Sequence, residues 1–347
     1  MFHKQRMDDE PKLSINIHLT LCAILWNEAD NVQDMLFTCV DYIDSAVLLL
    51  DDRTDDGTDA MIIDVLHQHE IPFQICKERW SDFATARNKC LAKVSCETTH
   101  VLFLDGDERL YVHSPDFRAD LEVYDVCMMQ VITKNKTGET MIRYPNLFRW
   151  HKSIKFVGKI HEQPMFPVDY TVQDDYLDAV IVHRRDHTDR VKKFKRDLEI
   201  CLNDEDVFPD SYGRREYYIA QCYLNLQQPN SAMVWFKKRM WMQTKDLGKD
   251  DEEKWHAGFM FAICLVQVGR LVEAIDQFTM VYTERPTRAE PLDMMAKLYA
   301  ELGYEDKAQS LRNKMTKMVM PQNDRVGLNP SLYGNKSGSD ETSQQNN

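Results

Sequence analysis

Long apolar runs and paired cysteines are both missing from this chain of 347 residues. No apolar run approaches the roughly 18–20 residues that span a bilayer, and the longest candidate, Ser45 to Leu50, is only as long as one strand. Residues 1–13 are polar and charged and contain no hydrophobic signal region, so we expect a cytoplasmic protein without a transmembrane segment. The nine cysteines form no CxxC pair and no zinc-like cluster with histidine, which predicts reduced and mostly buried thiols.

Basic residues are also fewer than acidic ones. The chain has 43 Lys and Arg against 56 Asp and Glu, which gives a formal net charge of -13. Phosphate backbones repel such a chain, so we expect no general binding of nucleic acid. A small phosphorylated ligand is still allowed, because carboxylates can bind a metal ion that in turn holds the phosphate groups.

The hydrophobic pattern divides the chain into four segments. Residues 1–14 form a polar N-terminal tail, and residues 15–189 alternate apolar β-rich runs with helix-like stretches. This alternation predicts an α/β domain with a mostly parallel sheet and crossover helices. Residues 190–318 are almost wholly helical in pattern. Residues 319–347 are rich in Asn, Ser, Gly and Gln, which predicts a disordered tail.

The helical segment contains an internal repeat. Ala262, Leu265, Gly269 and Ala274 recur, 34 residues later in every case, as Ala296, Tyr299, Gly303 and Ala308. An earlier copy, with Ala220, Tyr223 and Ala232, precedes the middle copy by 42 residues, which predicts about eight extra residues near 244–251. A period of 34 is typical of tetratricopeptide helix pairs. The alternative is an ordinary helical bundle with coincidental spacing.

An apolar run ends abruptly in carboxylates in residues 101–108, VLFLDGDE. Asp105 and Asp107 are separated by Gly106, a residue that lets the backbone approach a ligand closely. Ligands of open α/β sheets bind outside the carboxyl ends of the strands. Two carboxylates held together there repel each other unless a cation lies between them, and Mg²⁺ or Mn²⁺ would also bind a diphosphate. The alternative is a solvated turn or a helix cap.

A second apolar run ends in carboxylates in residues 48–58, LLLDDRTDDGT. Asp51 lies at the end of this run, where it could accept a hydrogen bond from a nucleobase N–H or a ribose hydroxyl. Asp55 and Asp56 are interpreted as caps of the next helix or as solvated side chains.

Together these stretches resemble the family 2 glycosyltransferases, which have the GT-A fold. Five motifs occur in the family's order: residues 21–31 (LCAILWNEADN), 50–58 (LDDRTDDGT), 80–88 (WSDFATARN), 103–108 (FLDGDE) and 158–162 (GKIHE). The resemblance implies a GT-A domain with a Rossmann-like, mostly parallel sheet, followed by an all-α domain of tetratricopeptide-like repeats. The chain departs from the family where Arg53 and Asp55 replace small Gly and Thr, and where Gly106 replaces the commoner Ala. The changes at Arg53 and Asp55 are expected to alter the contacts to the base, and the change at Gly106 is expected to be harmless.

The resemblance also implies the donor and its ligands. Members transfer a sugar from a nucleotide-diphosphate donor, usually UDP-linked, with Mn²⁺ or Mg²⁺ holding the diphosphate. Asp107 is then the direct metal ligand, and Asp105 binds ribose or reaches the metal through water. Asp51 reads the base. Arg87 contacts the base or the phosphates with support from Asn88, unless it is a structural ion pair with a neighbouring acid.

Four more residues complete the predicted site. Glu28, in the family's opening motif, is predicted to bind the donor. Inverting transfer needs a general base, for which Glu162 is the candidate, with His161 beside it to pair with it or to bind the acceptor. A structural hydrogen-bond pair of these two is the alternative. His183 follows an apolar run and fits the late metal-ligating histidine of many GT-A enzymes, although a histidine that ends a strand is often structural.

Two other functions compete with glycosyl transfer. One is a scaffold that binds a sugar nucleotide without activity. The other is a nucleotidyltransferase, which is disfavoured because residues 26–30 after the first strand are acidic and lack glycine. The acceptor is expected to be a protein, a peptide or a glycan, and the helical repeats could also form a homodimer.

Overall fold

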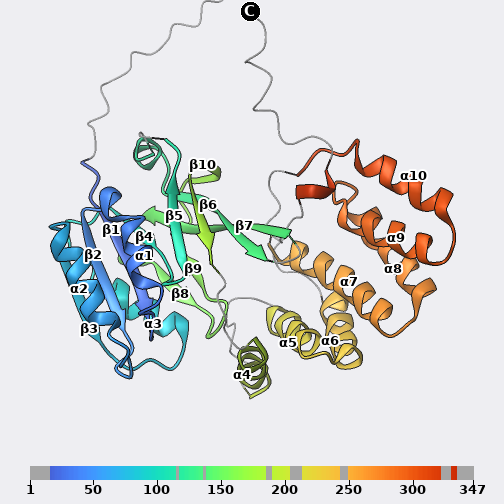
Figure 1. The fold of residues 1–347 in the computed structure, drawn as a ribbon, viewed down its shortest axis with the longest axis horizontal. Coiled ribbons are helices and arrows are strands. Elements are labelled where there is room, and N and C mark those ends of the chain that lie inside the picture. The colour runs from blue at the N-terminus through green and yellow to red at the C-terminus, as the bar shows by residue number, and fades with distance from the viewer. Residues whose placement is uncertain are drawn as a thin grey trace, which may run out of the picture.

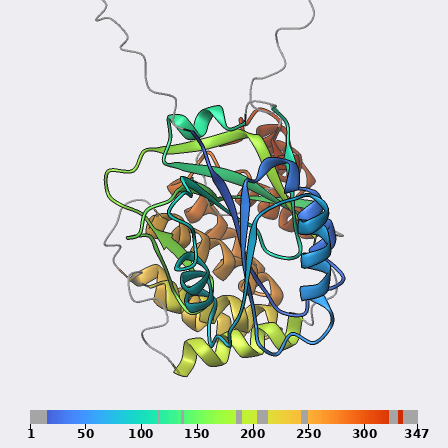
Figure 2. The same cartoon turned by 90° about the vertical axis from the view of Figure 1, so that its left-hand side faces the viewer.

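Two units follow one another along the chain in the computed structural model (Figure 1). The structure describes residues 16–114, 117–135, 138–184, 190–203, 213–242, 249–321 and 330–333. The first unit is α/β and ends with β10 (Val172–His183), and the second is helical and begins with α4 (Arg190–Asn203). The predicted N-terminal tail, residues 1–14, lies outside the described residues. When the molecule is turned by 90°, the helical unit lies behind the α/β unit (Figure 2).

An eight-stranded mixed sheet forms the centre of the α/β unit. Its strands, in spatial order, are β3 (Phe73–Lys77), β2 (Ser45–Leu50), β1 (Leu19–Leu25), β4 (His100–Phe103), β7 (Gly138–Arg149), β6 (Val126–Asn135), β10 and β5 (Glu108–Val112). The first four strands pair in parallel, and so do β6 and β10. The remaining pairs, β4–β7, β6–β7 and β10–β5, are antiparallel. A mostly parallel sheet was predicted, and its parallel majority is confirmed.

Alternate residues of the central strands enter two separate cores, one on each face of the sheet. Leu21, Ala23 and Leu48 pack on one face against α1 (Val32–Phe37) and α2 (Thr58–Gln68). The neighbouring residues of the same strands face the other side. There they pack against α3 (Phe83–Leu91) and the hairpin of β8 (Lys155–Val157) and β9 (Gln163–Met165). Strands buried on both faces explain the near-continuous apolar runs that the sequence shows there.

The helical unit consists of α4 and three helix pairs. The pairs are α5 (Arg214–Asn225) with α6 (Pro229–Trp241), α7 (Lys249–Gln267) with α8 (Leu271–Glu284), and α9 (Glu290–Glu301) with α10 (Glu305–Met315). Short 3-10 helices occur at Val40–Tyr42, Ala119–Glu122 and Pro330–Leu332. The six repeat alanines, Ala220, Ala232, Ala262, Ala274, Ala296 and Ala308, are all buried, as close packing within each pair requires.

The three helix pairs share one turn. Gly269 and Gly303 have positive φ angles of 78° and 82°, and Gln227, the corresponding residue of the first pair, has a φ of 59°. The residue after each donates its N–H to the carbonyl five residues earlier, for example Arg270 to Leu265 at 2.9 Å. The repeat read from the sequence is therefore present in the backbone, including the copy that lacks glycine. Of the predicted insertion, residues 244–248 lie outside the described residues, and residues 249–251 belong to the first turn of α7.

A small apolar and aromatic contact joins the two units. Ile160, in the loop before β9, packs with Cys201 of α4 and Ile219 of α5. The ring of His161 stacks on Tyr218 of α5, with 4.0 Å between centroids and an angle of 9° between planes. The GKIHE motif therefore lies at the junction of the units.

Part of the predicted disordered tail is packed, contrary to the expectation from composition. Tyr333 is buried against the helical core, and its hydroxyl accepts a hydrogen bond from the N–H of Ala289 at 3.1 Å. Met320 and Leu332 of the same segment also pack against this core. All nine cysteines are free thiols, and most are buried, as predicted. None of the helices in the described ranges is long and apolar enough to cross a membrane.

Candidate functional site

The predicted carboxylates gather where β1, β2 and β4 end. These strands pair in parallel, with Leu25 beside Leu50 and Cys22 beside Phe103, so their carboxyl ends meet at one edge of the sheet. The turns that follow carry Glu28, Asp51 and the DGD sequence. This is the edge at which open α/β sheets bind ligands.

Reciprocal hydrogen bonds join the first two of these turns. Asn27 donates to Asp55 Oδ1 at 3.2 Å and accepts from the N–H of Asp55 at 3.1 Å. Asp56 accepts from the N–H of Thr58, the first residue of α2, and from the N–H of Ala29. Asp56 therefore accepts from the first N–H of α2, whereas Asp55 bonds to Asn27 and does not cap the helix. Asn27 has a left-handed φ of 54°, a strained conformation of the kind that concentrates at functional sites.

Asp107 and His183 lie in contact. The Nε2 atom of His183 is 2.8 Å from Oδ2 of Asp107, and the N–H of Arg184 donates to the carbonyl of Asp107 at 2.8 Å. Antiparallel pairing of β5 with β10 places His183 opposite Glu108 and so creates the contact. Two of the residues predicted to bind the metal, from distant parts of the sequence, are thus brought together.

Asp105 points to a different partner. Its carboxylate accepts from Nη2 of Arg87 at 2.7 Å, while Nε of Arg87 donates to Glu162 at 2.5 Å. The guanidinium is buried and lies against the rings of Phe103 and Phe156. Arg87 is therefore fixed between two carboxylates, and it is an ion pair with neighbouring acids as well as a candidate ligand of the donor.

Negative charge is crowded around the DGD turn. Burial, with added repulsion from Asp107 and Asp105, raises the pKa of Glu28 to about 7. Burial and the charge of Asp105 also raise the pKa of Glu108 above its usual range. Gly106 fits closely against Glu28, because a Cβ atom there would lie 2.8 Å from its side chain. Carboxylates held together in this way favour a bound cation.

The donor set fits a divalent cation with few protein ligands. Among the described residues, no three His, Cys, Asp or Glu side chains converge as a metal site would require. Asp107 and His183 do converge, whereas Asp105 is turned toward Arg87. A cation here would complete its coordination with water and with oxygens of a phosphorylated ligand. Of the three residues predicted to hold a metal, Asp107 and His183 lie in contact, and Asp105 does not join them.

Two other predicted residues are engaged elsewhere. Asn88 binds the backbone of Phe156 with both ends of its amide, at 2.9 and 2.7 Å, and so fastens α3 to β8. His161 turns its ring toward Tyr218 and does not pair with Glu162. The backbone at His161 is left-handed, with a φ of 49°. Glu162 itself is buried and contacts Arg87.

Sequence reasoning missed three residues that shape the site. Arg109 is almost fully buried and donates to the carbonyls of Gly106 and Glu108, which holds the DGD turn in place. Tyr144 donates to the carbonyl of Glu162 at 2.6 Å, and Asn146 donates to the carbonyl of Phe103 at 3.0 Å. An arginine inside a buried strand was a signal for the first. The other two lie on β7, and no local sequence pattern predicts the position of that strand in the sheet.

Asp51 is already occupied by an arginine. Its buried carboxylate accepts from Nε of Arg53 at 2.5 Å, from Nη2 at 2.6 Å and from the backbone N–H at 3.0 Å. These hydrogen bonds lower the pKa of Asp51 to about 2. The guanidinium also lies over the ring of Trp26, at 4.2 Å from its centroid. Asp51 is thus placed where the sequence predicts, but its lone pairs are in use.

Comparison with known proteins gives partial similarity to a glycosyltransferase. No model of a known protein family matches the chain. The SPbeta prophage-derived glycosyltransferase SunS of Bacillus subtilis (strain 168) is 28% identical over 153 residues. The glycosyltransferase SunS of Bacillus phage SPbeta is similar to the same degree. The match covers 42% of this chain and 35% of each relative, so it spans about a third of the relatives' length.

Solved structures resemble the chain over about a third of its length. YrrB, a TPR protein with an unusual peptide-binding site, has a TM-score of 0.29 with 22% identity, over 35% of this chain and 59% of its own. MamA has a TM-score of 0.27 with 17% identity, over 36% of this chain and 63% of its own. At such scores, the assignment of helical repeats depends on the three shared turns described above.

Proposed function

We propose that this protein is an inverting glycosyltransferase that moves a sugar from a nucleoside-diphosphate donor, UDP-linked by family resemblance, to an acceptor. The contact between Asp107 and His183, at the carboxyl ends of parallel strands, is the observation that carries the proposal. The partial similarity to a glycosyltransferase supports glycosyl transfer as the reaction class. The GT-A domain and its family 2 membership belong to the same proposal.

Asp107 and His183 would hold the cation. An aspartate oxygen with an imidazole nitrogen suits Mn²⁺ better than Mg²⁺, which prefers oxygen ligands alone. When bound, the cation supplies positive charge that stabilises the departing diphosphate. Its charge would also favour the ionised forms of Glu28 and Glu108, whose pKa values are raised by burial and, to a smaller degree, by repulsion from Asp105 and Asp107.

The remaining residues would position the donor and activate the acceptor. Arg87, clamped between Asp105 and Glu162, offers an oriented positive charge next to the predicted diphosphate. Asp105 is half exposed and can also accept a ribose hydroxyl. Glu162 would take the acceptor proton through Oε2, since Oε1 is bonded to Arg87.

Calorimetry of UDP binding, with and without Mn²⁺, tests the donor site. Wild-type protein should bind UDP in a Mn²⁺-dependent manner, and Asp107→Ala should lose this binding. Asp59→Ala is the matched control, because Asp59 is a carboxylate on α2 that is paired with Lys77 at the surface. Absence of binding to UDP, GDP, CDP and dTDP, with either Mn²⁺ or Mg²⁺, would refute the proposal.

A binding protein without catalytic activity is the second candidate. It is favoured by one observation: the predicted base, Glu162, is paired with Arg87, which makes a carboxylate a weaker base. Slow hydrolysis of a UDP-sugar by wild-type protein that Glu162→Gln abolishes would support the enzyme. Tight donor binding without any turnover across a panel of UDP-sugars and acceptors would support the binding protein.

A further inference from the structure

We infer that Arg53 is a built-in competitor for the donor's nucleobase, which must displace it from Asp51 and Trp26 in order to bind. This inference rests on the proposed function and adds a residue that sets the affinity and the base preference of the donor site. Three observations carry it: the double hydrogen bond of Arg53 to the buried Asp51, the position of its guanidinium over the ring of Trp26, and the exposure of the Arg53 and Trp26 side chains.

Arg53 mimics a base in both shape and hydrogen bonding. The guanidinium is planar, and its Nε and Nη2 atoms donate side by side to the two oxygens of Asp51. The central carbon of the guanidinium also lies over the ring of Trp26, 4.2 Å from its centroid. A nucleobase that donates a ring N–H to Asp51 while stacking on Trp26 would need the same space. Base and guanidinium therefore exclude each other.

The arrangement allows Arg53 to leave. Its side chain is 39% exposed, whereas that of Asp51 is fully buried, so the arginine can swing into solvent while the carboxylate stays. Asp51 would keep its hydrogen bonds from the backbone N–H groups of Arg53 and Trp80. Trp26 is 49% exposed and would present a free face. The site is therefore complete without the guanidinium.

The chemistry also limits which bases compete well. Uracil, thymine and guanine carry a ring N–H that a carboxylate can accept, whereas the corresponding ring nitrogen of cytosine is itself an acceptor that Asp51 would repel. Nucleotides of the first group should gain most when Arg53 is removed. This expectation separates competition at the base from a general change in charge.

Calorimetry of UDP and CDP binding to Arg53→Ala and Arg53→Gln, with Mn²⁺ present, tests the inference. Hydrogen bonds to a charged group must break before the base enters, so UDP should bind about tenfold more tightly to Arg53→Ala. CDP should gain clearly less. Loss of a positive charge near an anionic ligand would ordinarily weaken binding, so the expected sign is opposite to the simple electrostatic one.

Arg79→Ala is the matched control, because Arg79 forms a similar exposed pair with the adjacent Asp52. It should leave UDP affinity unchanged, and Arg53→Gln should give an intermediate gain. Weaker or unchanged UDP binding to folded Arg53→Ala, or an equal gain for UDP and CDP, would overturn the inference while leaving the proposed function standing. Failure of wild type and all variants to bind any nucleotide would instead refute the proposed function.

Discussion

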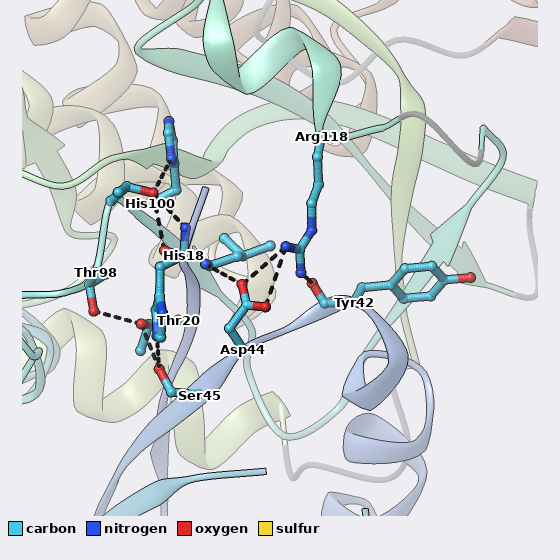
Figure 3. A network of polar contacts seen from close by, with 10 residues as sticks. His18, Thr20, Tyr42, Asp44, Ser45, Thr98, His100 and Arg118 are labelled. Atoms are coloured by element: carbon cyan, nitrogen blue, oxygen red, sulfur yellow. Dashed lines mark hydrogen bonds and ion pairs between the residues drawn. The ribbon is translucent and has the colours of Figure 1, made fainter. Parts of the chain in front are cut away.

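The two ends of the same three strands, β1, β2 and β4, have opposite character. At the amino ends, neutral polar groups satisfy one another: Thr20 Oγ1 lies 2.9 Å from Ser45 Oγ and 2.7 Å from Thr98 Oγ1 (Figure 3). At the carboxyl ends, Glu28 and Glu108 are crowded by the DGD turn, and their pKa values are raised.

The difference separates stability from function. A satisfied hydrogen-bond network inside a protein stabilises the fold, because its members lose little when they leave water. A buried carboxylate with a raised pKa opposes folding at neutral pH, because the unfolded chain ionises it more easily. Groups held in such an unfavourable state concentrate at binding sites. The carboxyl ends are therefore expected to carry function, and the amino ends to carry stability.

The largest effect is expected at the carboxyl end, on activity alone. Asp107→Asn should lower turnover of a UDP-sugar by about 100-fold or more, because the developing charge on the diphosphate loses its support. Its free energy of unfolding should stay within about 1 kcal/mol of wild type, because Asp107 is partly exposed. Donor hydrolysis and urea unfolding measure the two quantities. A large loss of stability would remove the contrast between the two ends.

The reverse pattern is expected at the amino end. Thr20→Val keeps the size of a buried side chain but leaves Ser45 and Thr98 without their shared partner. The free energy of unfolding should fall by about 2 kcal/mol, with UDP binding unchanged. Thr20→Ser retains the hydroxyl and should recover much of the stability. If Thr20→Val weakened UDP binding in the folded protein, the two ends would be coupled.

Much of the carboxyl end could be predicted because parallel strands bring distant motifs to one edge. Asp105, Asp107 and Asp51 each follow an apolar run, so placing the strands also placed the carboxylates. The contact between His183 and Asp107 is harder to predict from the sequence, because it requires β10 to pair with β5. Family resemblance suggested that contact, and no local pattern did.

The partners of the predicted residues could not be inferred in the same way. Arg87 reaches Glu162, and Asn88 fastens α3 to β8, because of packing between segments about 70 residues apart. His161 faces Tyr218 across the junction of the two units, where sequence periodicity carries no information. Such contacts depend on tertiary packing rather than on local propensity.

The next largest effect is a pH-dependent change in stability that is expected from His100, at the amino end of β4. His100 is buried, and desolvation together with the charge of Arg149 lowers its pKa to about 4, below the ordinary 6.5. Between these values the unfolded chain binds the extra proton, so stability falls as the pH decreases from about 6.5 toward 4. Urea unfolding at pH 7.5 and pH 5 should show that His100→Gln loses about 1–2 kcal/mol less than wild type. Equal losses would mean that His100 does not contribute.

The smallest effect is expected where the amino end meets solvent. Arg118 pairs with Asp44 at 3.0 Å and donates to the carbonyl of Tyr42 (Figure 3). Both side chains of the ion pair are about one-third exposed, so Arg118→Gln should lower the free energy of unfolding by only about 0.5–1 kcal/mol. Adding about 0.5 M salt should shrink this loss, since the pair is screened. The loss caused by Thr20→Val should not change with salt, because the hydroxyl network is neutral and buried. If both losses responded equally to salt, the amino ends would be stabilised by charge–charge attraction. The two ends would then differ only in whether their charges attract or repel.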